Sequence, residues 1–175
     1  AAELTTSRKK AAEKLAEKIS AELAFLDMPD IRLVFDITQD KVTLSGMDKV
    51  EMLISVNKGE ELKPMSKIAS GGELSRIMLA VKAVLAQHDE IPTLIFDEID
   101  VGISGRTAQM VAEKMSYIGN THQVICISHL AQIAAMADAH YLIEKSSHKD
   151  HTSTDIRMLD TEESVNELAR ILGGV

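Results

Sequence analysis

Two adjacent acidic residues, Asp97 and Glu98, follow the apolar run Leu94-Ile95-Phe96 in the stretch TLIFDEID. Such a run predicts a strand that is buried on both faces, as the strands of parallel sheets are. Charged groups at its end are costly unless they meet a cation or a polar ligand, and open α/β sheets bind ligands at this end of their strands. The pair therefore predicts one carboxylate that holds Mg²⁺, usually through water, and a neighbour that activates a water molecule. Two solvated acids at a strand end are the alternative.

Both acids can face one ligand only if the chain turns directly after the strand, because adjacent strand residues point to opposite faces of a sheet. Gly102 and Gly105 follow closely, and glycine adopts the backbone conformations that tight turns need. We therefore expect a turn immediately after this strand.

A second candidate is the start of the helix expected over residues 71–88. Ser70 and Glu73 have the spacing of a capping box, but Gly71 and Gly72 are poor helix formers. Bare backbone at a helix start lets a ligand reach free N–H groups, where the helix dipole favours anions. The pattern predicts a phosphate cap, with a plain helix cap as the alternative. If phosphate approach explains the glycines, replacing Gly72 by Ala should leave stability unchanged or raise it.

The third candidate is His129, which follows an apolar strand expected over 122–127 and precedes another helix. Strand 93–97, helix 105–118 and strand 122–127 predict one right-handed βαβ unit. That unit places His129 at the same sheet edge as the two acids, one strand away. A neutral imidazole there can hydrogen-bond a terminal phosphate oxygen, and a purely structural histidine is the alternative.

The hydrophobic pattern predicts the elements that position these residues. A helix over 2–26 and strands over 31–38 and 50–57 indicate an antiparallel patch behind a helix. From residue 71 onward, helices alternate with strands, which is typical of a parallel α/β sheet. The later elements expected are a helix over 130–137, a strand over 139–144, an edge strand over 154–160 and a last helix over 163–174.

Composition limits the function classes. The chain has 175 residues, of which 45% are apolar and 3% aromatic, and its net charge is −8. A chain this acidic is a poor non-specific binder of DNA backbone, and Arg8-Lys9-Lys10 is best interpreted as a solvated helix face. Cys126 stands alone, so we expect no disulfide framework and a reducing cytosol. No apolar segment is long enough to span a membrane, and a chain that starts on Ala1 without Met is expected to be a fragment.

The order of these motifs resembles the C-terminal half of an ABC-type ATPase head. ASGGEL is similar to the ABC signature, LIFDE to the Walker B strand, IDVGIS to the D-loop and ISH to the switch histidine. The longer stretches KIASGGELSRIMLAVKAVLA, PTLIFDEIDVGISGRTA, VICISHLAQIAAMAD and NELARILGG resemble an SMC-like family of bacterial DNA repair proteins. The resemblance covers most of residues 50–174. It implies that 1–28 is a helix at the base of a coiled coil and that 29–175 is the C-terminal half of the head.

The resemblance also implies roles for single residues. The signature residues would cap the γ-phosphate of an ATP held by the opposite head of a dimer, and the D-loop would cross the dimer interface. Asp97 would support Mg²⁺, Glu98 would be the general base and His129 would contact the γ-phosphate. The ATP-binding residues implied in addition are Ser70, Gly71, Gly72, Glu73 and Asp100.

The sequence departs from the complete pattern because it contains no Gly-x-x-x-x-Gly-Lys-[Ser/Thr] phosphate loop. The resemblance implies that the N-terminal half of the same head supplies this loop and that ATPase activity belongs to the full-length protein. The expected partners are that half, a second head in an ATP-sandwiched homodimer, and DNA. The expected location is the cytoplasm, at the nucleoid, with no membrane contact. An ABC transporter ATPase subunit and a non-catalytic dimerisation module are the alternatives.

Overall fold

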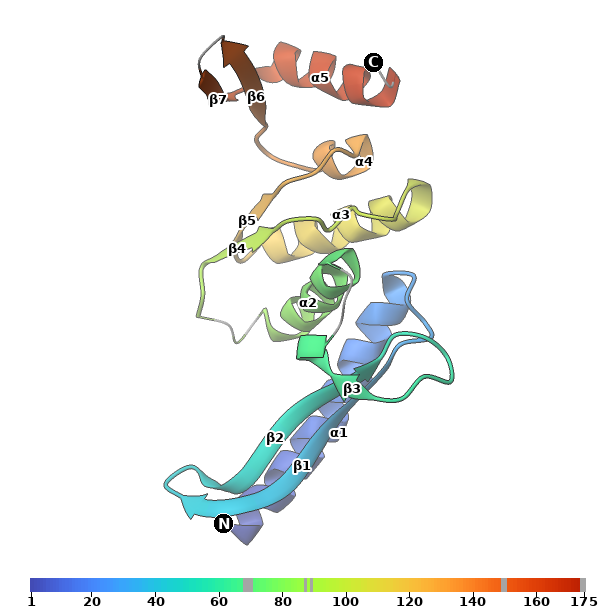
Figure 1. Cartoon of the computed structure of the whole chain (residues 1–175), viewed down its shortest axis with the longest axis vertical. Helices are drawn as coiled ribbons and strands as arrows, with labels where there is room; N and C mark the ends of the chain where they lie inside the picture. Colours follow the sequence, from blue (N-terminus) through green and yellow to red (C-terminus); the bar gives the residue numbers. More distant parts are fainter. Residues whose placement is uncertain (68–70, 87, 89, 149–150, 174–175) are drawn as a thin grey trace.

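The computed structural model is elongated, with the two termini at opposite ends (Figure 1). It describes residues 1–67, 71–86, 88, 90–148 and 151–173. The helices are α1 (Ala2–Phe25), α2 (Gly71–Leu85), α3 (Gly105–Gly119), α4 (Ala131–Ala134) and α5 (Thr161–Gly173), with a 3₁₀ turn η1 (Met65–Lys67). The strands are β1 (Arg32–Thr43), β2 (Gly46–Ser55), β3 (Lys63–Pro64), β4 (Thr93–Phe96), β5 (Gln123–Cys126), β6 (Tyr141–His148) and β7 (His151–Met158).

One end of the molecule is a long helix packed on a long hairpin. The antiparallel strands β1 and β2 run beside α1 for most of its length (Figure 1). Ile19 and Leu23 of α1 are fully buried, and Leu33 of β1, paired with Ile54 of β2, joins them in the core. The expected helix and antiparallel patch are confirmed, and the strand-like stretch KVTL (41–44) falls mostly within β1. Strand β1 continues through residues 39–43 with a register shift, and β2 begins at Gly46, earlier than the predicted residue 50.

The middle of the molecule contains the predicted βαβ unit. Strands β4 and β5 pair in parallel, with Leu94 opposite Val124 and Phe96 opposite Cys126, and α3 connects them. Leu94 and Phe96 are buried in the same core as α1, α2 and α3. This register places the ends of both strands at one edge.

Only one face of this parallel pair is covered by the described residues. Ile95 is 68% exposed, and Ile125 and Ile127 are 45% and 50% exposed. The expectation that the strand before Asp97 is buried on both faces is therefore wrong for this chain. Its even-numbered side chains face the core and Ile95 faces outward, because no described element packs against that side.

The strand expected over 139–144 does not extend the parallel sheet. It is β6, which pairs antiparallel with β7, with Tyr141 opposite Met158 and Ile143 opposite Ile156. The two strands are consecutive in the chain, so they pair at a small loop-closure cost. Helix α5 follows β7 at the end of the molecule opposite α1 (Figure 1). Among the described residues, no helix has the length and apolarity required to cross a membrane.

Candidate functional site

The acidic pair lies in a sharp turn that begins directly after β4. Glu98 has φ of 56°, the left-handed region that non-glycine residues rarely adopt. The Asp97 carboxylate accepts a hydrogen bond of 2.9 Å from the Glu98 N–H, and Gly102 and Gly105 also have positive φ. The predicted turn is confirmed, and it leaves both carboxylates exposed. Backbone strain of this kind is concentrated at functional sites in proteins.

The carboxylates of this turn suit a metal site in which the protein supplies only one or two of the ligands. Within the described residues, no group of three or more His, Cys, Asp and Glu side chains could hold a metal ion. Magnesium commonly uses one or two carboxylates and takes its other ligands from water and substrate phosphates. The exposed carboxylate of Asp97 fits that type of site, so a nucleotide would have to supply the remaining ligands.

The two glycines at the start of α2 contact the same turn. Gly72 is buried, and a Cβ there would lie 2.9 Å from the Val101 carbonyl oxygen and 3.2 Å from that of Glu98. A Cβ at Gly71 would collide with the Glu98 carboxylate. The glycines therefore let α2 pack closely on the turn within one chain. This packing opposes the expectation that Gly72→Ala preserves stability, because the new methyl group would meet backbone atoms.

Two further side chains of α2, which the sequence analysis did not select, hold the turn in place. Ser75 Oγ donates a hydrogen bond of 2.9 Å to the Asp97 carbonyl, and Arg76 Nη1 donates one of 3.0 Å to the Val101 carbonyl. Arg76 is buried, and burial lowers the pKa of its guanidinium while Glu73 opposes that shift. In the sequence Arg76 directly precedes the apolar run 77–81, and nothing in that pattern indicated that its side chain is buried. Ser70, and with it the proposed capping box with Glu73, lies outside the described residues.

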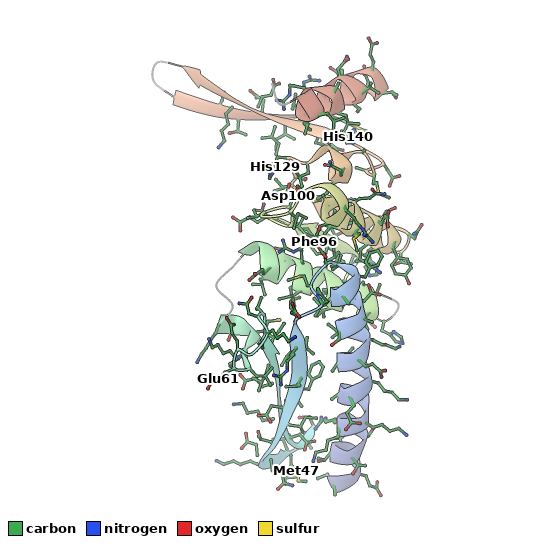
Figure 2. All side chains as sticks on the ribbon, turned by 90° about the vertical axis from the view of Figure 1, so that its right-hand side faces the viewer. Met47, Glu61, Phe96, Asp100, His129 and His140 are labelled. Carbon is green, nitrogen blue, oxygen red and sulfur yellow. The ribbon has the colours of Figure 1, made fainter. Side chains whose placement is uncertain are left out.

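The same loop carries Asp100, whose side chain is 3% exposed and meets the segment after β5. Its Oδ2 accepts hydrogen bonds from Ser128 Oγ (2.7 Å) and from the His129 N–H (2.8 Å). The ring Nδ1 of His129 lies 3.0 Å from the same oxygen, and Asp100 and His129 lie close together in Figure 2. Ser128 Oγ also accepts the Leu130 N–H at 3.1 Å, just before α4 begins.

The acid pair and His129 thus share one sheet edge, as predicted, and Asp100 links them. No interaction joins His129 directly to Asp97 or Glu98 among the described residues. The His129 side chain is 75% exposed, so its ring is open to a ligand. The Asp100 carboxylate is turned into the chain and is not presented on its surface.

Cys126, at the end of β5, is excluded as a nucleophile. Burial raises the pKa of its thiol to about 12, and the charges of Asp100 and Asp97 act in the same direction. The thiolate is the reactive form of cysteine, so this residue stays protonated and packs as part of the sheet.

Comparison with known proteins finds relatives that align with nearly the whole chain. No protein-family model matches the chain. It is 44% identical over 179 residues to the DNA repair protein RecN of Halalkalibacterium halodurans, an alignment that includes 99% of this chain and 32% of the relative. The chain is similar to a segment of RecN. The RecN of Treponema pallidum is 47% identical over 178 residues, which include 98% of this chain and 31% of the relative. The chain therefore spans about a third of the length of these RecN relatives.

Solved structures of SMC proteins are similar to this chain. The Smc head domain with a coiled coil and joint from Pyrococcus yayanosii has a TM-score of 0.62 at 23% identity, covering 90% of this chain and 29% of that one. A chain from a study of ATP-driven dimerization of SMC ATPases has a TM-score of 0.56 at 21% identity. It covers 96% of this chain, and 97% of its own length is matched. The fold expected from the sequence, part of an SMC-like head, is confirmed.

Proposed function

We propose that the chain is the C-terminal half of the ATPase head of an SMC-like DNA repair protein of the RecN type. Residues 1–28 form the helix at the base of its coiled coil, and 29–175 belong to the head. The similarity to RecN relatives and the SMC-head fold support this assignment. The observation that carries it is the single loop after β4, which contacts the glycines of α2 and reaches His129 through Asp100.

In this proposal the full-length protein binds ATP with Mg²⁺ and hydrolyses it between two heads. Asp97 holds Mg²⁺, which offsets the negative charge of the phosphates. Glu98 is the general base that takes a proton from the attacking water, and His129 contacts the terminal phosphate. The signature residues Ser70, Gly71 and Glu73 would face the nucleotide of the opposite head, while Gly72 packs against the loop after β4. The loop that begins at Asp100 would border the second head.

The N-terminal half of the same head is the partner that completes the fold. It would bring the phosphate loop that the sequence lacks, and it would cover the exposed isoleucines of β4 and β5. The assembled protein would act on DNA in the recombinational repair of double-strand breaks, in the cytoplasm and at the nucleoid. The chain by itself is expected to show no measurable ATP turnover, because it has no phosphate-loop lysine.

The test uses the full-length protein with Glu98→Gln. The amide has the size of the carboxylate but cannot accept a proton, so hydrolysis should slow by ~10²-fold or more while ATP and Mg²⁺ binding are kept. ATP-bound dimers should accumulate and be visible by sedimentation. Glu90→Gln, at an exposed acid before β4, is the control and should hydrolyse ATP normally. Normal turnover by Glu98→Gln would contradict the assignment of the base.

A further inference from the structure

The two glycines at the start of α2 meet different parts of the loop after β4. A Cβ at Gly72 would approach backbone atoms, the carbonyl oxygens of Val101 and Glu98 at 2.9 and 3.2 Å. Among the described residues, a Cβ at Gly71 would meet the side chain of Glu98: it would collide with Oε2 and lie 3.5 Å from Cδ. The Glu98 carboxylate therefore rests directly against the bare Cα of Gly71.

The backbone that carries this carboxylate is held on both sides. The Glu98 N–H donates a hydrogen bond of 2.9 Å to Asp97 Oδ1, and the Glu98 carbonyl accepts the Val101 N–H at 3.2 Å. Its φ of 56° is one that non-glycine residues rarely adopt, so these contacts must hold the turn in place. With the backbone fixed, the side-chain torsions of Glu98 and the space around them decide where the carboxylate lies.

We infer that Gly71 is a positioning residue, which sets the place of the Glu98 carboxylate by having no side chain of its own. A side chain at 71 would take the space that Oε2 fills, and the carboxylate would have to rotate away. The inference rests on the proposed function, in which Glu98 is the general base. The backbone of Gly71 can still face the nucleotide of the opposite head, because the missing Cβ points at Glu98 of its own chain.

The first measurement tests the contact itself and needs no nucleotide. In nitrogen–proton correlation spectra of the ¹⁵N-labelled chain, Glu98→Gln should move the amide signal of Gly71, because the group that rests on its Cα loses its charge. Glu90→Gln, at an exposed acid before β4, should leave that signal in place. Gly119, where a Cβ would meet nothing within 4 Å, should not move in either variant. A Gly71 signal unaffected by Glu98→Gln would overturn the inference.

The second measurement separates turnover from stability. Gly71→Ala should melt at or above the wild-type temperature, because alanine is the better helix former and its methyl group displaces only the end of a flexible side chain. In the full-length protein it should lower kcat for ATP hydrolysis by ~10-fold or more, since small misplacements of reacting groups are costly, and leave KM for ATP unchanged. Gly72→Ala is the matched variant and should lose stability, because its methyl group meets backbone atoms. An unchanged kcat in Gly71→Ala would also overturn the inference.

ATP-driven assembly decides whether the missing side chain of Gly71 serves its own head or the opposite one. In full-length Glu98→Gln, which is expected to accumulate ATP-bound dimers, the additional change Gly71→Ala should leave the dimer fraction in sedimentation unchanged. Loss of those dimers would show that the methyl group obstructs the nucleotide of the opposite head, and the positioning role would be wrong. A full-length protein without ATPase activity, whose Gly71 signal still responds to Glu98→Gln, would overturn the proposed function and leave the contact between Gly71 and Glu98 standing.

Discussion

The hairpin β1–β2 and the parallel pair β4–β5 are both small sheets with a helix on one face, but their outer faces differ. On β1 the inward Leu33 is buried, and the outward positions carry Arg32, Val34 and Asp36, two of which are charged. On β4 and β5 the outward positions are the exposed isoleucines 95, 125 and 127. Antiparallel sheets commonly carry a polar, solvated face, whereas parallel sheets are covered on both faces.

The difference indicates that the hairpin needs no further layer, whereas the parallel pair exposes an apolar face that a further layer could cover. The hairpin is also held to α1 at its turn end, where Arg8 and Thr5 bond to Asp48. The parallel pair has no equivalent on its outer side among the described residues. Burial of an exposed isoleucine side chain contributes ~1.5–3 kcal/mol, so a layer placed over this face would gain substantially. The proposed catalytic loop follows β4 directly, so it lies next to this uncovered face of the parallel pair.

The largest expected effect comes from charging the uncovered face. Ile95→Lys in the full-length protein should prevent the N-terminal half of the head from packing on β4, because a lysine buried there would be unpaired. When the two halves are expressed as separate chains, we expect their affinity to fall by more than ~100-fold. Co-purification and sedimentation measure this association.

The matched control is Val34→Lys, at an exposed apolar position on the outer face of β1. That face is already solvated, so the variant should associate normally and melt at the wild-type temperature. If both lysine variants associate equally well, the outer face of β4 and β5 is not the surface that the N-terminal half covers.

A smaller effect is expected where α2 approaches the loop after β4. Gly72→Ala places a methyl group 2.9 Å from the Val101 carbonyl oxygen, and overpacking of this kind costs ~1–3 kcal/mol of the free energy of unfolding. Gly119→Ala is the control. Gly119 is the last residue of α3, as Gly72 is the second residue of α2, and a Cβ at Gly119 would meet nothing within 4 Å. Thermal melts should show a lower melting temperature for Gly72→Ala only. Equal or higher stability of Gly72→Ala would restore the phosphate explanation of this glycine.

The sequence predicted the sheet edge better than it predicted the packing around it. Asp97 and His129 could be placed at one edge because parallel strands end on the same side, and apolar runs mark where each strand stops. The reason for Gly72 could not be predicted, because it depends on a backbone atom of Val101, which α2 meets only in the folded chain. The buried contacts of Asp100 could not be predicted for the same reason: its hydrogen-bond donors come from the segment after the next strand.

Short sequence patterns, such as the spacing of a capping box, did not show by themselves where in the chain the motif forms. The structure has a capping box at the start of α5, where Asp160 accepts the Glu163 N–H at 2.8 Å and Glu163 accepts the Asp160 N–H at 3.0 Å. The sequence analysis assigned this motif to Ser70 and Glu73 and not to this pair, although both have the same spacing. The pairing of β6 was predicted wrongly as parallel, since a short strand carries no sign of whether its neighbour is parallel or antiparallel.

The smallest expected effect tests the finished end of the molecule. The Asp48 side chain has no exposed surface, although it lies near the thin end of the hairpin and is covered mainly by its partners. The hydrogen bonds from Thr5 and Arg8, in that order, hold the pKa of the Asp48 carboxyl below its ordinary value of 3.8. A carboxyl whose pKa is lower in the folded state than in the unfolded state stabilises the fold at pH values above the unfolded-state pKa. This contribution is lost as the pH falls through the folded-state pKa.

Asp48→Asn removes this contribution and should therefore melt below the wild type at neutral pH. The difference should be only a few degrees, because ion pairs near a surface contribute little. The gap should close as the pH falls below about 4. Circular-dichroism melts of both chains across that range provide the measurement, and a gap independent of pH would show that the Asp48 charge does not fasten the hairpin to α1.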